Sequence, residues 1–439
     1  MRSLRRRRFR MFRPIPRPLA GRRLPPELRV GKVGRIAAGL LGLSDPRFEV
    51  LLRRIDSAPI FGGNEVEVFT SGEEAFAAMR EAAAMAEREI LLESYIFRDD
   101  GTGRLFAEYL AAAAKRGVQV RVVTDAVGSF GTKRLFWAEL ESGGIEVRVF
   151  HPLLNDLSSQ LFRDHRKIFV VDRKIAFTGG MNIGEEYGSL IRRHRHHHRH
   201  RHHHILSRPL DTWRDTHVRV AGPAAWDLAT VFCEGWARAG GNLIELEPLP
   251  ASAAEAPGAR ILVLDTRPGR GQGEAASVFA AIVGAARRSV YLTNAYFAPG
   301  HTAVKILGEA AARGVDVRVL LPGKTDVPLV RHAGHGYYGD LLDRGVRIFE
   351  YQPAILHAKS LVADGLVSVV GSTNLDFRSF VFNAECNLVI LDPAAGEVME
   401  EAFLRDLHHA IEIEPGPWRA RPLHHRAGDR LARLLSPLL

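Results

Sequence analysis

Two stretches of the chain carry the same reactive side chains at the same spacing. One runs from His165 to Asn182 and the other from His357 to Asn374, and both fit His-x-Lys-x4-Asp-x6-Gly-x2-Asn. One such match could be an accident, but two matches with identical internal spacing are a strong signal. The residues that the pattern fixes are His165, Lys167, Asp172, Gly179 and Asn182 in the first copy, and His357, Lys359, Asp364, Gly371 and Asn374 in the second.

Each copy offers an imidazole, an ammonium group and an amide, a set that suits a tetrahedral anion such as a phosphate ester. The ammonium and the amide can offset charge on phosphoryl oxygens, while the imidazole can act as nucleophile or acid. The alternating residues that follow each His predict a strand, on which residues two apart share a face. His165 and Lys167 therefore point the same way. The aspartates fall on the opposite face, and we interpret Asp172 and Asp364 as structural residues that pair with neighbouring backbone or arginine.

The two copies resemble the paired HKD motifs of the phospholipase D superfamily, and the sequence around them resembles the bacterial cardiolipin synthases. The segments that carry this resemblance are 163–168, 178–184, 213–219 and 374–380, followed by Asn383 and Glu385. The resemblance implies an α/β fold with two homologous phospholipase D-like α/β/α sandwich halves. A pseudo-twofold axis would relate these halves and place the active site between them.

The same resemblance implies a reaction scheme. One histidine attacks phosphorus to give a phosphohistidine, and the other protonates the leaving alcohol and then deprotonates the incoming one. By this resemblance His165 is the nucleophile and His357 the general acid, and the motif lysines and asparagines hold the phosphoryl oxygens. No metal and no other cofactor is expected.

An acidic residue should orient the far nitrogen of each imidazole. Glu385 lies 28 residues beyond His357, where the family places such an acid, and it could raise the pKa of His357. The counterpart in the first half is Asp215, within Trp-Arg-Asp-Thr-His. We therefore expect each acid to serve the histidine of its own half.

The order of strands and helices also repeats. Arg-Gly-Val occurs at residue 116 and again 197 residues later, close to the 192 residues between the two motif histidines. We predict a basic arm with short amphipathic helices, a first half, a second half and a C-terminal tail, connected by a low-complexity run at 248–258. The predicted bounds are 1–58, 59–248, 259–413 and 414–439. Alternating strands and helices predict a mainly parallel sheet covered on both faces.

The net charge of +10 is concentrated at the N-terminus, because residues 1–26 hold ten arginines and no acid. The rest of the chain is neutral, which argues against a nuclease. The arm could bind an anionic membrane surface or nucleic acid, or act only as a solubilising tail. The apolar residues at helical spacing in 28–55 could contact a membrane or pack on the body. No signal peptide or membrane-spanning helix is evident, so we expect a peripheral protein on the cytoplasmic side of a bacterial cytoplasmic membrane.

One segment interrupts the repeat. Residues 192–204 contain eight histidines and five arginines in the first half, where the second half passes from Asn374 to Glu385 in eleven residues. We interpret this tract as a mobile insertion near the cleft. Metal binding and contact with lipid head groups are less favoured alternatives.

The expected activity is phosphatidyl transfer from phosphatidylglycerol to a second phospholipid, which gives cardiolipin. A phospholipase D hydrolase that cleaves phospholipids or another diester would share every catalytic residue and is the main alternative. A nuclease fits less well because the body is neutral, and a binding protein without catalysis fits less well because both motifs are complete. The sequence sets neither the acceptor alcohol nor an oligomeric state.

Overall fold

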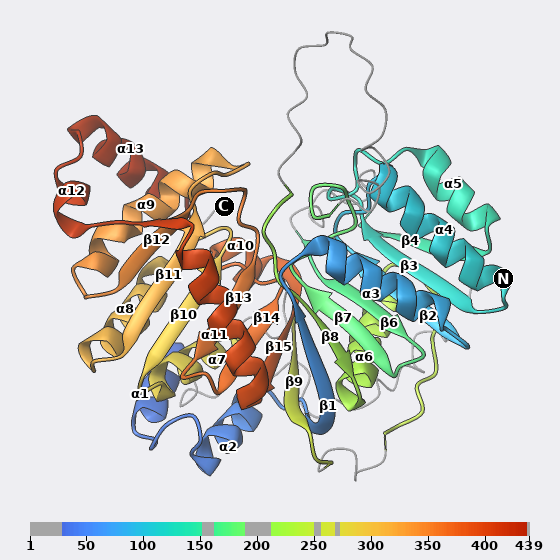
Figure 1. Ribbon diagram of the computed structural model, residues 1–439, viewed down its shortest axis with the longest axis horizontal. Coiled ribbons are helices and arrows are strands. Elements are labelled where there is room, and N and C mark those ends of the chain that lie inside the picture. The colour runs from blue at the N-terminus through green and yellow to red at the C-terminus, as the bar shows by residue number, and fades with distance from the viewer. Residues whose placement is uncertain (1–28, 152–161, 189–211, 250–255, 268–272, 437–439) are drawn as a thin grey trace, which may run out of the picture.

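The chain follows a duplicated plan in the computed structural model, which describes residues 29–151, 162–188, 212–249, 256–267 and 273–436 (Figure 1). The first half comprises β1 (Ile60–Phe69), α3 (Gly72–Ala84), β2 (Glu89–Ser94), α4 (Gly101–Lys115), β3 (Gln119–Asp125), α5 (Arg134–Ser142), β4 (Ile145–Phe150), β5 (Arg163–Asp164), β6 (Lys167–Val171), β7 (Ile175–Gly179), β8 (His217–Ala221) and α6 (Pro223–Arg238). The second half comprises β9 (Ala259–Thr266), α7 (Glu274–Ala285), β10 (Ser289–Asn294), α8 (Gly300–Ala312), β11 (Asp316–Pro322), α9 (Pro328–Leu342), β12 (Arg347–Tyr351), β13 (Lys359–Ala363), β14 (Val367–Gly371), α10 (Phe377–Val381), β15 (Asn383–Leu391), α11 (Pro393–Leu407) and β16 (Ala410–Glu412).

Local signals in the sequence set the ends of these elements. The side chain of Ser71 caps α3 by accepting a hydrogen bond from the backbone N–H of Glu74. Gly117 follows α4 with a φ of 92°, a left-handed conformation that glycine adopts without strain. Strand β2 is buried along its whole length, because helices cover the sheet.

One sheet runs through both halves. From the centre outward, the first half has the order β1-β8-β7-β6-β2-β3-β4 and the second half the order β9-β15-β14-β13-β10-β11-β12. Every strand in these two series has its counterpart at the same distance from the centre, where β1 and β9 pair antiparallel. This arrangement confirms the predicted duplication and its pseudo-twofold relation.

The sheet is mixed, which corrects the expectation of a mainly parallel one. The series β2-β3-β4 and β10-β11-β12 run parallel. The motif strands instead form two antiparallel hairpins, β6–β7 and β13–β14. The cause is the tight turn after each motif aspartate, where Asp172 and Asp364 have φ values of 51° and 54°.

Helices cover both faces of the sheet. Helices α3, α4 and α5 pack on one face of the first half, and α7, α8 and α9 pack in the same way on the second. On the other face, α6 of the first half and α11 of the second contribute to one shared apolar core. The two halves are therefore joined by packing as well as by the sheet.

Two further segments lie on the second half. Helices α1 (Val30–Ala38) and α2 (Pro46–Ile55) bury their apolar faces against α7, so the body, not a membrane, covers these faces. Residues 414–436, expected as a tail, form α12 (Pro415–Arg419) and α13 (Leu423–Leu434) on the outer side of α9. The arginine-rich arm and the tract 192–204 lie outside the described residues. Across the part of the chain that the structure describes, no helix is long and apolar enough to cross a membrane.

Candidate active site

The motif histidines precede β6 and β13, and each is clamped to the opposite half through its backbone. The N–H of His165 donates to the carbonyl of Ala384 at 2.9 Å, and the N–H of His357 donates to the carbonyl of Arg214 at 2.7 Å. Short strand pairings flank both contacts, since β5 pairs with β15 and Arg214 bridges to Leu356. The duplicated motifs thus meet at the junction between the halves.

The acidic partners are also exchanged between the halves. His165 Nδ1 donates to Glu385 at 2.9 Å, whereas His357 Nδ1 donates to Asp215 at 2.7 Å. This crossing corrects the expectation that each acid serves its own half, and with it the argument that Glu385 raises the pKa of His357. Glu385 lies on β15, and Asp215 lies just before β8. Both strands flank the junction strands, so these side chains reach the histidine across the junction.

Burial disfavours the protonated, charged form of both imidazoles and so lowers their pKa values. It lowers the pKa of His357 to about 3, with the nearby Lys359 charge adding to this effect and Asp215 opposing it. Burial also lowers the pKa of His165, although Glu385 opposes the shift. With Nδ1 held by an acid in each case, the Nε2 atoms are the ones that can react at phosphorus, and Nε2 of His357 also lies 2.9 Å from Lys359 Nζ.

The lysines lie beside the histidines. Lys167 Nζ donates to the carbonyl of His165 at 2.5 Å, and Lys359 Nζ lies 2.8 and 2.9 Å from the two ring nitrogens of His357. Burial lowers the pKa of Lys167 to about 7 and that of Lys359 to about 8. An anion bound between them would favour their charged forms.

The two motif asparagines differ. Asn182 uses its amide within the protein, because Oδ1 accepts from the N–H of Ile96 at 3.1 Å and Nδ2 donates to the Tyr187 hydroxyl at 2.7 Å. In the second half, Asn374 has a buried Oδ1 with no hydrogen-bond partner among the described residues. Both side chains border the same cavity.

The motif aspartates stand away from this chemistry. Asp172 accepts hydrogen bonds from the backbone N–H groups of residues 87, 88 and 89, at 2.8 to 2.9 Å. Asp364 accepts in the same way from residues 287, 288 and 289. Each carboxylate thereby ties the hairpin turn to the start of the neighbouring strand, which is backbone pairing of the kind expected from the sequence.

The motif glycines allow the hairpins to lie against the strands that carry the acids. A Cβ atom at Gly179, whose φ is 152°, would meet the carbonyl oxygen of Thr216 at 2.4 Å. At Gly371 it would meet the carbonyl oxygen of Cys386 at 2.4 Å. Larger side chains would therefore push apart the motif hairpin and the strand that holds the acid.

A cavity of about 410 Å³ opens between the halves and receives both histidines. Its walls contain aromatic and charged residues to which the sequence analysis assigned no role, although four of them lie in the segments that carry the family resemblance. The most notable are Tyr95, Arg163, Tyr187, Trp213, Tyr296, Asp376 and Arg378. Tyr95 and Tyr296 follow equivalent strands, with ring centres 5.0 Å from His165 and 6.0 Å from His357. The repeated tyrosine after β2 and β10 was the signal that could have identified this pair.

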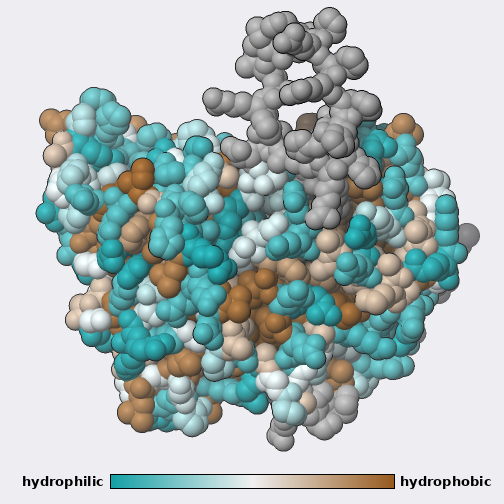
Figure 2. Space-filling model, viewed as in Figure 1, coloured by the Kyte–Doolittle hydropathy of each residue, from teal (hydrophilic) through white to brown (hydrophobic). Residues whose placement is uncertain are grey.

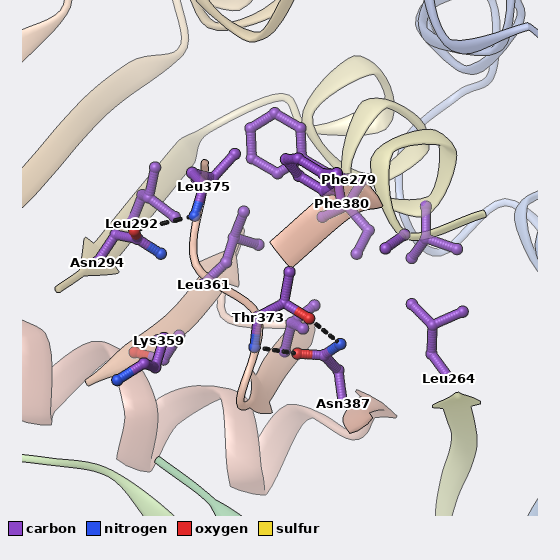
Figure 3. Close-up of a pocket in the computed structure, with 15 residues that line it drawn as sticks. Leu264, Phe279, Leu292, Asn294, Lys359, Leu361, Thr373, Leu375, Phe380 and Asn387 are labelled. Carbon is purple, nitrogen blue, oxygen red and sulfur yellow. Dashed lines mark hydrogen bonds between the residues drawn. The ribbon is translucent and has the colours of Figure 1, made fainter. Parts of the chain in front are cut away.

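A second, apolar pocket lies behind Lys359, between the sheet and α7 (Figure 3). Its volume is about 70 Å³, and Leu361, Val369 and Phe380 are among its lining residues. Figure 3 shows Lys359 at one side of this pocket and the Thr373–Asn387 hydrogen bonds at another.

Comparison with known proteins agrees with this geometry. The family described as cardiolipin synthase, PLD-like domain, matches residues 79–190 and 280–407, which together make up more than half of the chain. The chain belongs to this family. Cardiolipin synthases of Halalkalibacterium halodurans and Geobacillus kaustophilus are 32% and 33% identical to it, over 89% and 90% of this chain and 75% and 77% of theirs.

The fold of this family member also matches a solved structure. The crystal structure of phosphatidylserine synthase from Haemophilus influenzae superposes with a TM-score of 0.64 at 13% identity, covering 90% of this chain and 99% of that one. The likeness supports the two-half phospholipase D fold. The family match and the similar cardiolipin synthases show that the protein is an enzyme of the phospholipase D superfamily, and its two motifs lie at one cavity.

Proposed function

We propose that the protein makes cardiolipin by transferring a phosphatidyl group from phosphatidylglycerol to a second phospholipid. The observation that carries the proposal is the crossed pair of acid-oriented histidines at one cavity between the halves. Two imidazoles with separate orienting acids suit a two-step displacement, in which one forms a covalent bond and the other moves protons. The names of the relatives in this family supply the lipid class.

In the first step, His165 Nε2 attacks phosphorus of the donor. The N–P bond forms as the P–O bond to the leaving glycerol breaks, and that oxygen takes a proton from His357. In the second step, the hydroxyl of the acceptor lipid gives its proton back to His357 and attacks phosphorus. The P–N bond then breaks and His165 returns to its neutral form.

The groups around the histidines fit these steps. We assign Lys167, Lys359 and the Nδ2 groups of Asn182 and Asn374 to the phosphoryl oxygens, where the second Nδ2 hydrogen of Asn182 lies beyond its bond to Tyr187. We assign Glu385 and Asp215 to orientation of the two imidazoles. The substrate phosphodiester is itself an anion, so its binding raises the pKa values of the buried lysines and histidines towards their charged forms. The acid needed for the first step is thus produced in the complex with substrate.

The main alternative is hydrolysis, in which water replaces the acceptor lipid. Purified protein should be incubated with labelled phosphatidylglycerol vesicles and the products separated. Cardiolipin with free glycerol supports transfer, whereas phosphatidic acid with glycerol would show a phospholipase D. The variant His357→Ala is the matched control, and degradation of added DNA would instead indicate a nuclease.

We also propose a peripheral location on the cytoplasmic side of a bacterial cytoplasmic membrane. Lipid substrates demand a membrane surface, and the ten arginines of residues 1–26 suit an anionic one. A chain that begins at residue 27 should bind anionic vesicles more weakly, most clearly at low salt. Equal binding of the two chains would reject a membrane role for the arm.

A further inference from the structure

Helix α13 carries an apolar stripe on its outer side. Leu423, Ala427, Leu431 and Leu434 fall within about 80° on a helix with 3.6 residues per turn, and the three leucines are 77%, 65% and 74% exposed. Figure 2 shows apolar side chains at the upper left edge of the molecule, where Figure 1 places α13. A stripe of this kind is typical of a helix that lies in a membrane interface.

An arginine-rich hollow of about 310 Å³ adjoins this stripe, bounded by α9, α12 and α13. Its charged lining consists of Arg419, Arg421, Arg426, Arg430, Arg433, Asp340, Asp343 and Asp429, together with His335. The carboxylates are all used, since Asp340 pairs with Arg433, Asp343 with Arg419 and Asp429 with Arg421.

Two further arginines line the hollow and take no part in these three ion pairs. In the described part of the chain, Arg426 and Arg430 form no ion pair with a carboxylate, so the five arginines and three aspartates leave two positive charges. These charges stand on the same helix as the exposed leucines. Paired apolar and cationic surfaces of this type complement the acyl region and the phosphate groups of an anionic bilayer.

The helix is firmly attached to the catalytic body. Asp429 accepts a hydrogen bond from His332 Nδ1 at 2.9 Å, and Arg433 donates to the carbonyl of Gly336 at 2.7 Å, so α13 is fixed along α9. The first turn of α9 in turn borders the catalytic cavity through Val330. A membrane bound by α13 would therefore lie beside the cavity.

The first half offers a matching rim. Phe130 and Leu135, after β3, are 75% and 67% exposed. The strand before them ends at Asp125, whose carboxylate accepts from the N–H of Asp164, next to His165. In Figure 1 helices α5 and α13 both lie in the upper part of the molecule, with α1 and α2 in the lower part. Apolar side chains thus stand at the active-site edge of both halves.

We propose that α13 and its arginine-lined hollow dock the enzyme onto a bilayer that contains anionic phospholipid, with Phe130 and Leu135 entering the same surface across the cavity. The docking proposal rests on the proposed function, because docking serves to let lipid substrates reach the cavity from a membrane. Its physical support is independent of catalysis.

The test measures binding of the full chain to vesicles of phosphatidylcholine alone or mixed with phosphatidylglycerol. Arg426→Gln with Arg430→Gln should weaken binding to mixed vesicles by tenfold or more, because each basic residue near an anionic surface contributes roughly a factor of five. Leu431→Ser with Leu434→Ser should weaken it to a similar degree. The matched controls are Arg54→Gln and Leu41→Ser at the opposite edge, which should bind like the parent. Variants are compared only if their thermal unfolding matches that of the parent.

A second readout is independent of any binding by the arm. Tryptophan in place of Leu434 should be quenched by vesicles with brominated acyl chains, whereas tryptophan in place of Leu41 should not. Unchanged vesicle affinity in both double variants, or no quenching at residue 434, overturns the docking proposal. Loss of DNA binding with intact vesicle binding would assign the hollow to nucleic acid and also overturn it.

The two proposals fail in different ways. If the parent forms no cardiolipin but the variants still lose vesicle binding, transfer is wrong and docking stands. If cardiolipin forms at the parental rate and binding does not change, docking is wrong and transfer stands. Turnover of a monomeric short-chain substrate should remain parental in all these variants, because none of the substituted residues borders the catalytic cavity.

Discussion

The two halves share their chemistry but differ behind the catalytic lysines. Phe169 and Phe177 fill the layer between sheet and helices in the first half, and the residues 192 positions later are Leu361 and Val369. The smaller side chains leave the apolar pocket beside Lys359 in the second half (Figure 3). The two halves therefore share their reacting groups but differ in the apolar packing behind them.

A similar difference separates the asparagines. Tyr187 holds the amide of Asn182, but the position 192 residues later is Ser379, whose hydroxyl accepts from the backbone N–H of Asn374. The first-half amide is therefore fixed by the protein, and the second-half amide has an oxygen left over for a ligand. The two asparagines therefore differ in how firmly the protein itself holds their amides.

The largest expected effect tests whether the halves are equally necessary. His165→Ala and His357→Ala should each lose nearly all turnover, by roughly 10⁴-fold or more, because nucleophile and acid act as a unit. The measurement is the initial rate of product formation from labelled phosphatidylglycerol. Substantial activity in either variant would break the shared-site mechanism.

The covalent intermediate shows which half performs the attack. We expect label on the peptide that contains His165 after a slow substrate is quenched at high pH, where phosphohistidine survives. Label on the His357 peptide alone would reverse the assignment and keep the two-histidine mechanism. The crossed acids remove the local argument that Glu385 makes His357 the acid, so this experiment decides the point.

The next effect concerns the crossed acids. Glu385→Gln and Asp215→Asn should each reduce turnover by about 10² to 10⁴, as loss of an orienting carboxylate does in hydrolytic triads. Each acid raises the pKa of its partner, so Glu385→Gln should lower the pKa of His165 and Asp215→Asn that of His357. Histidine NMR titration measures both values. A shift at the histidine of the same half would contradict the crossing.

The crossed pairing of acids and histidines could not be predicted from the sequence. The duplicated motifs, the repeat spacing and the two-half fold follow from residue patterns, because periodicity and turns are local properties of the chain. The pairings of Glu385 and Asp215 are not local, since they depend on how β15 and β8 meet across the junction. The order of residues along the chain suggested the opposite pairing.

Other features also could not be predicted, because they depend on contacts between segments that are distant in the sequence. Residues 28–55 showed an apolar face, but only the packed structure shows that α7 covers it. The expectation of a mainly parallel sheet missed that β6–β7 and β13–β14 pair antiparallel, which follows from the turns at Asp172 and Asp364. The contact between the rings of Tyr95 and His165 likewise depends on the folded structure.

A smaller effect is expected with pH. The pKa of Lys167 is lowered to about 7 and that of Lys359 to about 8 by burial, so both lose their charge as pH rises through this range. Substrate binding needs these charges, so KM should increase as pH rises above about 7, by up to tenfold per pH unit for each proton lost. The pKa of His357 is lowered to about 3, so this group should produce no inflection near pH 6.5 in the pH profile of kcat/KM. An alkaline limb near 10.5 would contradict the buried-lysine account.

The smallest effect is expected when the apolar residues that pack behind the two motif lysines are exchanged between the halves. Leu361→Phe copies the first half into the second and adds a volume of about 25 Å³ to a pocket of about 70 Å³. At about 24 cal/mol per Å³ of cavity filled, the free energy of unfolding should rise by about 0.6 kcal/mol. The reverse change, Phe169→Leu, removes contacts from the filled layer and should cost about 1 kcal/mol.

Denaturant unfolding of the two variants measures whether the free energy of unfolding rises in Leu361→Phe and falls in Phe169→Leu. Measurement of KM for each lipid then tests whether the pocket takes part in substrate binding. If the pocket is only a consequence of smaller side chains, Leu361→Phe leaves KM unchanged for both lipids, and this is the expected outcome. The lining is almost wholly apolar and lies behind Lys359, so a hydrocarbon is the substrate part that it could accept. A KM that rises for the acceptor alone, with kcat unchanged, would show that lipid carbon enters the pocket. The asymmetry of the halves would then extend from packing to substrate choice.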